Sequence, residues 1–293
     1  MVVLLSLLAA TAFALGTVLQ QKGTLLDDVG AADRTGVAGV GFVVGLLRRP
    51  VWLLGGAITA VGGLVQAVAL HLGSLVLVQA LATTSLVIAL PFGAWLTDQQ
   101  VTPPVVLGAC SMVLGIVLFV VVGNPEGGTG APAAASWWLA GLGSLCLVAL
   151  LVRSGRNRTG SRQALLFGAA AGVGFGLASA LTKAVTDLVG HGPAAVLGSW
   201  ELYALLAAGL VGLFLGQSSL RTGALAPAMA ATNSVMLLSS VWLGVSVFGE
   251  RFQRGGGHLV GAAAGLVAIL AGVALLARAP VPGRAPARSG SSA

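Results

Sequence analysis

Long runs of apolar residues, each close to the length that crosses a bilayer, constrain the fold of this sequence more than any other feature. About 20 helical residues span the roughly 30 Å hydrocarbon layer. The runs lack the strict alternation of barrel strands, so they predict helices. Hydrophobic residues make up 57% of the 293 residues and charged residues only 8%, against roughly 25% charged in soluble domains. The chain is therefore predicted to be an all-α polytopic membrane protein.

Nine of these runs predict about nine transmembrane helices, joined mostly by short connections. Their approximate bounds are 2–21, 51–70, 74–97, 103–122, 136–152, 163–184, 194–215, 222–248 and 257–277. Residues 37–47 are apolar but too short to span the bilayer, and whether they form an additional short span is left open.

A loop rich in glycine, proline and alanine, residues 123–135, marks the boundary between two halves. The predicted organisation is a first transmembrane repeat at 1–122, a segment at 123–162 with the fifth helix and a basic loop, a second repeat at 163–278, and a disordered cytoplasmic tail at 279–293.

Positive charges are distributed unequally between the two sides that nine spans define. Twelve fall on one side: Lys22, Arg34, Arg48, Arg49, Arg153, Arg156, Arg158, Arg162, Arg221, Arg278, Arg284 and Arg288. The other side has Lys183, Arg251 and Arg254. The positive-inside rule predicts a multi-pass protein of the cell membrane with its N-terminus outside and its C-terminus in the cytoplasm. Topology therefore explains the formal charge of +7 better than a nucleic-acid partner does.

The two halves resemble each other. Three glycines recur at a displacement of 150 residues, Gly62 with Gly212, Gly73 with Gly223 and Gly115 with Gly265, and a polar pair moves with them, Thr83 and Thr84 with Asn233 and Ser234. The first helix matches the sixth at a displacement of 162, as in Phe13 with Phe175. These two helices run in opposite directions, so we expect two inverted repeats of four helices with the fifth helix between them, an arrangement typical of transporters.

Short motifs carry a family resemblance. The stretch Gly223-Ala224-Leu225-Ala226, followed by a long helix and Phe248-Gly249-Glu250-Arg251-Phe252, resembles the second half of the drug/metabolite transporter superfamily, the EamA-like proteins. The segment 13–23 is similar to the branch of NIPA-like magnesium transporters. The resemblance implies a secondary-active transporter of a small metabolite or cation. The magnesium-transporting relatives have an acidic residue near the position of Gly62 and Gly63, so Mg²⁺ is the alternative substrate.

Polar residues within the apolar spans are the candidate substrate-binding residues, because buried polar groups in membranes are costly and often functional. Thr83, Thr84, Asn233 and Ser234 lie near the predicted midplane, where they either line a cavity or make interhelical hydrogen bonds. Gln66 and Gln79 are placed to face the same cavity, or are interfacial.

Glu201 is the carboxylate placed well inside a predicted span. We expect it either to couple transport, as a proton carrier or cation ligand, or to form a structural ion pair with Lys183. Pro91 and Pro227 are predicted to break the third and eighth helices and to free backbone carbonyls, which would serve a ligand or a kink.

Several classes of function are not expected. No Walker motif, nucleophile set or histidine spacing indicates an enzyme, a cofactor or a metal site. Glycine stripes at Gly168, Gly172 and Gly176 and at Gly257, Gly261 and Gly265 favour tight packing inside the monomer over a homodimer interface. The expected partners are the lipid bilayer and a small solute or ion. A non-transporting membrane scaffold or sensor is the rival function.

Overall fold

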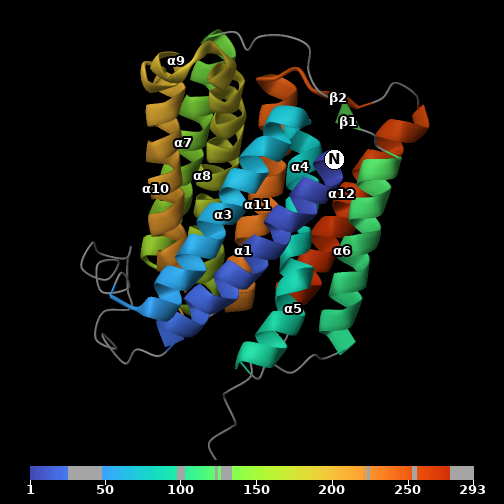
Figure 1. Cartoon of the computed structure of the whole chain (residues 1–293). Helices are drawn as coiled ribbons and strands as arrows, with labels where there is room; N and C mark the ends of the chain where they lie inside the picture. The colour runs from blue at the N-terminus through green and yellow to red at the C-terminus, as the bar shows by residue number, and fades with distance from the viewer. Residues whose placement is uncertain are drawn as a thin grey trace, which may run out of the picture.

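A bundle of helices that run between two ends forms the computed structural model of this chain (Figure 1). The structure describes residues 1–25, 48–97, 103–122, 125–126, 134–220, 222, 225–252 and 256–277. Eight apolar helical segments in it are long enough to cross a membrane, and Val106–Val121 is a shorter apolar helix. The chain is an all-α polytopic membrane protein, as its composition predicted. The short segment 37–47 and the predicted tail 279–293 lie outside the described residues.

The helices follow the predicted runs closely. They are α1 (Val2–Leu25), α3 (Pro50–Leu72), α4 (Leu75–Ala82), α5 (Thr84–Thr97), α6 (Pro103–Val121), α7 (Ala134–Arg156), α8 (Gly160–Leu188), α9 (Pro193–Leu197), α10 (Trp200–Leu220), α11 (Leu225–Ser246) and α12 (Gly256–Ala277). A 3-10 turn covers Val189–His191, and two short strands, β1 (Pro125–Glu126) and β2 (Arg251–Phe252), pair antiparallel.

Two predicted helices are interrupted. The third breaks at Thr83 because the hydroxyls of Thr83 and Thr84 donate to the carbonyls of Ala80 and Leu81, three residues earlier, and local bonds of this kind compete with the helical ladder. The seventh breaks before Trp200, where the Ser199 hydroxyl accepts from the Leu202 N–H as a new helix starts.

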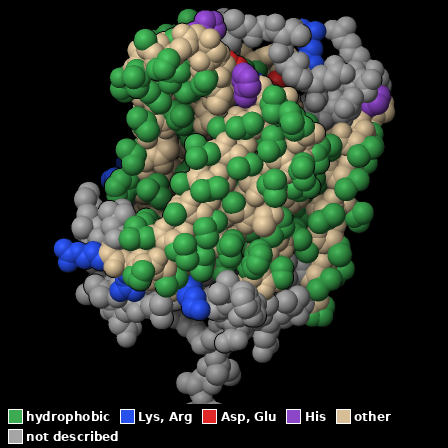
Figure 2. Space-filling view, in the orientation of Figure 1, with side chains coloured by type: hydrophobic (Ala, Val, Ile, Leu, Met, Phe, Trp, Pro, Cys, Tyr) green, Lys and Arg blue, Asp and Glu red, His purple; other side chains and the backbone are tan. Residues whose placement is uncertain are grey.

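Charged side chains gather at the two ends of the bundle, as Figure 2 shows for one face. The end formed by the C-terminus of α7 and the N-terminus of α8, here called the arginine end, carries exposed Arg153, Arg156, Arg158 and Arg162. The opposite end, here called the Glu250 end, carries His71, Asp187, His191, Glu250 and Arg251. On the face that Figure 2 shows, the surface between the two ends is largely hydrophobic, as a lipid-facing surface must be.

The helices α6 and α12 cross with their backbones in direct contact. A Cβ atom added to Gly115 would lie 2.6 Å from the amide nitrogen of Ile269, and one added to Gly265 would lie 2.6 Å from that of Phe119. Each added Cβ would also lie 2.8 Å from the carbonyl oxygen of the other glycine. The helices run antiparallel here. Ser111 Oγ donates to the Ala268 carbonyl near the crossing, and just past the end of α6 the Val122 carbonyl oxygen lies 2.6 Å from Nδ1 of His258, which comes earlier in α12.

An aromatic ring rests on a glycine in each half of the chain. The ring of Phe13 in α1 covers Gly62 in α3, and the ring of Phe175 in α8 covers Gly212 in α10; added Cβ atoms would lie 3.2 Å and 2.8 Å from the nearest atoms of these rings. Gly172 of the predicted stripe packs against Thr232 in α11 of the same molecule. Small residues therefore let these helix pairs approach closely.

Candidate functional site

The predicted midplane residues lie on two segments that the fold brings together. Ala80 and Leu81 of α4 share one apolar cluster with Ala230 and Leu237 of α11. Thr83 is buried and Thr84 is half-buried, with their hydroxyls on carbonyls of their own chain segment.

The amide of Asn233 likewise bonds within its own helix, since Nδ2 donates to the Met229 carbonyl at 2.9 Å. Ser234, the next residue, is half-buried. The hydrogen bonds described for Thr83, Thr84 and Asn233 all stay within their own segments, so the role of the four residues in binding a substrate remains a prediction.

Gln66 and Gln79 are both buried, Gln79 to 1% exposure. The Nε2 atom of each, like the hydroxyl of Ser240 in α11, has no hydrogen-bond partner within the described part of the chain. A buried donor without a partner costs about 1–3 kcal/mol, so these groups call for water or a ligand. Their position at a cavity stays a prediction.

Glu201 differs from its predicted placement. Because α10 begins at Trp200, Glu201 lies in the first turn of the helix, where its negative charge interacts favourably with the helix dipole. It is half-buried. Lys183 forms its ion pair with Glu250, which disfavours the alternative in which Glu201 is the structural partner of Lys183.

The two prolines do not end their helices. Pro227 lies in the first turn of α11, where backbone N–H groups lack helical partners in any case, so it does not interrupt the helix. Pro91 lies inside α5, which continues through it to Thr97. The interruption of this span occurs at Thr83 instead.

Glu250 is held in place by the way α11 ends. Gly249 has a φ of 62°, in the left-handed region that glycine adopts at helix C-termini, and the Glu250 N–H donates to the Gly244 carbonyl at 2.9 Å. The chain therefore folds back over the end of α11. This turn directs the Glu250 side chain toward the beginning of α4.

The carboxylate of Glu250 caps the N-terminus of α4. Its Oε1 accepts from the Leu75 N–H at 2.6 Å and its Oε2 from the Val76 N–H at 2.9 Å. The Ser74 hydroxyl accepts from the Leu77 N–H at 3.0 Å. Three N–H groups at the start of α4 are thus bonded by side chains, and the negative charge lies at the positive end of the helix dipole.

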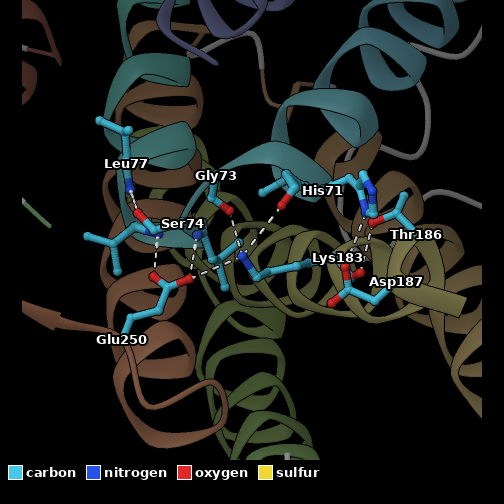
Figure 3. Close-up of polar contacts among 11 residues, drawn as sticks. His71, Gly73, Ser74, Leu77, Lys183, Thr186, Asp187 and Glu250 are labelled. Carbon is cyan, nitrogen blue, oxygen red and sulfur yellow. Dashed lines mark hydrogen bonds and ion pairs between the residues drawn. The ribbon is translucent and has the colours of Figure 1, made fainter. Parts of the chain in front are cut away.

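Lys183 of α8 lies beside the turn at Gly73 and Ser74 that joins α3 to α4, here called the α3–α4 turn (Figure 3). Its Nζ donates to the carbonyls of Gly73 and Leu70, at 2.6 Å and 3.4 Å, and lies 3.5 Å from Glu250 Oε1. A cation thus bonds the last carbonyls of α3 while an anion caps the start of α4. The side chain of Lys183 is 13% exposed and that of Glu250 is 1% exposed, so the pair is largely withdrawn from solvent.

Apolar side chains surround this pair. One buried cluster combines Leu75 and Val78 of α4 with Ala180 of α8 and Leu243 of α11. The ring of Phe248 lies below the Lys183 ammonium, with 5.5 Å between Nζ and the ring centroid. The low dielectric of such surroundings strengthens the attraction between Lys183 and Glu250.

A second pair at the same end is much more exposed. His71 Nδ1 lies 3.3 Å from Asp187 Oδ1, and both side chains are 54% exposed (Figure 3). The His71–Asp187 pair joins α3 to α8, as some bonds of Lys183 also do. Unlike the Lys183–Glu250 pair, it is open to solvent. It therefore serves as a natural comparison for the buried pair.

The sequence contained part of the signal for the Lys183–Glu250 pair. Glu250 stands out in a compact Gly-Glu-Arg turn after an apolar run, and Lys183 is the one lysine within an apolar run. Nothing in the sequence indicates that these residues meet across the α3–α4 turn. In the described residues no group of three or more His, Cys, Asp or Glu could hold a metal ion.

Comparison with known proteins gives one informative similarity. The chain is 27% identical over 258 residues to a protein of Corynebacterium glutamicum that is described as uncharacterized, and the alignment covers 86% of each chain. No family model matches the chain, and no solved structure matches it. The similarity spans most of both chains and names no substrate.

Proposed function

We propose that this protein is a secondary-active transporter that moves a small metabolite or cation by alternating access between two inverted repeats. The observation that carries the proposal is the crossing of α6 and α12. At the displacement of 150 residues, Gly115 corresponds to Gly265 and Phe119 to Ile269. Gly115 packs against the backbone of Ile269 in the same way that Gly265 packs against the backbone of Phe119. Such reciprocal contact is the property of an interface on a two-fold axis.

Packing within each half supports the same proposal. Phe13 and Phe175 correspond at the displacement of 162, and Gly62 and Gly212 correspond at 150. The contact of ring and glycine occurs in both halves. Two structurally similar halves of opposite orientation can exchange conformations, which closes one end as the other opens.

The proposed orientation follows the positive-inside rule. The arginine end would face the cytoplasm, and the Glu250 end would face outward. The N-terminus of α1 lies at the Glu250 end and would therefore be outside the cell (Figure 1). The C-terminal tail would be cytoplasmic.

The midplane groups favour a neutral or amphipathic metabolite. Thr83, Asn233 and Gln79 offer hydrogen bonds but no charge. Hydrated magnesium needs only one or two carboxylates, and Glu201 could be one of them. The positions of Gly62 and Gly63 lack the acidic residue of the magnesium-transporting relatives, which places Mg²⁺ second.

Flux into proteoliposomes across a panel of neutral metabolites, amines and Mg²⁺ tests this function. We expect a neutral or amphipathic solute to enter at least about tenfold faster than into protein-free vesicles, and Asn233→Leu to abolish that excess because it removes a midplane hydrogen-bonding group. Leu238→Ala, a change on the exposed face of the same helix, is the matched control and should retain it. Mg²⁺ entering faster than any metabolite would contradict the proposed substrate class.

A further inference from the structure

The Lys183–Glu250 pair joins parts of the chain that alternating access would have to separate. Lys183 is on α8 and Glu250 follows α11, both in the second half, whereas the carbonyls and N–H groups that they bind belong to the α3–α4 turn of the first half. Every one of these bonds therefore crosses between the halves. All lie at the Glu250 end of the bundle (Figure 3).

Buried apolar residues of α4 and of one face of α11 pack together at this same end. In α4, Leu75, Val78 and Ala80 are fully buried, and in α11 Leu237 and Leu243 are fully buried. Burial in the next stretches toward the arginine end is mixed. Residues 231–236 of α11 are half-buried, whereas Leu86 and Ala89 of α5 and Ala230 of α11 are buried.

We propose that the Lys183–Glu250 pair, with the apolar cluster around Leu75 and Leu243, is the gate that closes the transport path at the Glu250 end. The proposal rests on the transport function proposed above. To open this end, the α3–α4 turn must leave both side chains. The carboxylate would then lose two N–H donors and the ammonium would lose two carbonyls, and all of these groups would become hydrated.

Two unpartnered polar groups lie directly beneath the gate. Gln79 is four residues from Leu75 on the same face of α4, and Ser240 is four residues from Gly244 on the same face of α11, which places both about 6 Å deeper in the bundle. Both side chains are buried, and the Nε2 of Gln79 and the hydroxyl of Ser240 have no partner among the described residues. These are the first polar groups that a solute would meet once the gate opens.

The sequence repeat does not conserve the cation of the gate. At the displacement of 162 residues, the position that corresponds to Lys183 is Gln21. A neutral glutamine cannot supply the cation of such an ion pair at that position. The closed Glu250 end should therefore be the more populated state without substrate, since a contact made in one state alone shifts the equilibrium toward it.

Cysteine accessibility tests the gate in the full chain. The background replaces the exposed native thiols, Cys110→Ser and Cys146→Ser, and Gln79→Cys is the reporter. A membrane-impermeant, positively charged thiol reagent is applied to cells and to inverted vesicles. His191→Cys and Arg158→Cys, exposed residues at the Glu250 end and the arginine end, identify which side of the protein the reagent reaches.

Opening the gate should expose the reporter from the Glu250 side. We expect Glu250→Gln, and independently Lys183→Met, to raise the labelling rate of Gln79→Cys from that side about tenfold or more, because reaction of a buried thiol follows the population of open molecules. Lys183→Met keeps the carboxylate on α4, so it preserves the test should Glu250→Gln fold poorly. Asp187→Asn, which breaks the exposed pair at the same end of the bundle, is the matched control and should leave the rate unchanged.

Two other outcomes overturn the proposal in distinguishable ways. Unchanged labelling of Gln79→Cys in both folded gate variants, with Asn233→Cys still reached from the arginine end, would show that the pair is not the gate while leaving transport intact. Failure of reagent to reach Asn233→Cys from either side in any background would remove the transport function, and the gate with it.

Discussion

Replacing Glu250 with alanine is expected to lower the free energy of unfolding by about 3–5 kcal/mol. The change removes the acceptor of the Leu75 and Val76 N–H groups and leaves Lys183 without its counter-ion in largely buried surroundings. Removal of one member of a buried pair is costly because the remaining charge keeps its desolvation penalty. Equilibrium unfolding in mild detergent, followed by helical circular dichroism, would measure the loss.

The exposed pair at the same end provides the control for this prediction. Asp187→Ala breaks the contact with His71, but both side chains are 54% exposed, so the expected loss is below about 1 kcal/mol. If Glu250→Ala cost no more than Asp187→Ala, the buried network would contribute little to the fold. The α3–α4 turn would then have to be held by apolar packing.

The second large effect is expected at the crossing of α6 and α12. Gly115→Ala and Gly265→Ala should each lower the free energy of unfolding by about 2–3 kcal/mol, because the new methyl group would meet backbone atoms at 2.6 to 2.8 Å and the helices would have to separate. Since the contact is reciprocal, the two losses should be similar. Thermal unfolding of the two variants in one detergent tests this equality directly.

Glycines without close neighbours should respond in the opposite direction. A Cβ on Gly63 of α3 or on Gly141 of α7 would have nothing within 4 Å, so alanine there should be neutral or should stabilise its helix by up to about 1 kcal/mol. A neutral result for Gly115→Ala, matching Gly63→Ala, would mean that the close approach of α6 and α12 is not required for stability.

The helices could be predicted from the sequence because their signal is local. An apolar run of about 20 residues needs no tertiary information to specify a membrane helix, and α1, α3, α6 and α12 begin and end within a few residues of the predicted bounds. The displacements that relate Phe13 to Phe175 and Gly62 to Gly212 could also be read from the sequence. Only the contacts between these residues in space link the two displacements to similar packing in the two halves.

The breaks and the ion pair could not be predicted in the same way. The interruption at Thr83 depends on the backbone carbonyls to which the hydroxyls of Thr83 and Thr84 donate. These bonds cannot be read from a continuous apolar run. Because α10 starts at Trp200, Glu201 lies in the first turn of a helix and not well inside a span. The partner of Lys183 depends on the turn at Gly249, which places Glu250 beside the start of α4. Such a long-range contact has no signal in the spacing of the sequence.

The most direct measurement of transport by alternating access is two-sided labelling of Asn233→Cys in the background that lacks Cys110 and Cys146. With the Glu250 end closed, we expect an impermeant thiol reagent to reach this midplane position from the arginine end alone. In the Lys183→Met variant the same position should also become reachable from the Glu250 end, since one site then communicates with either side in turn. An Asn233→Cys thiol that stays closed to both sides in both backgrounds, in protein shown to be folded, would contradict transport and favour a membrane scaffold.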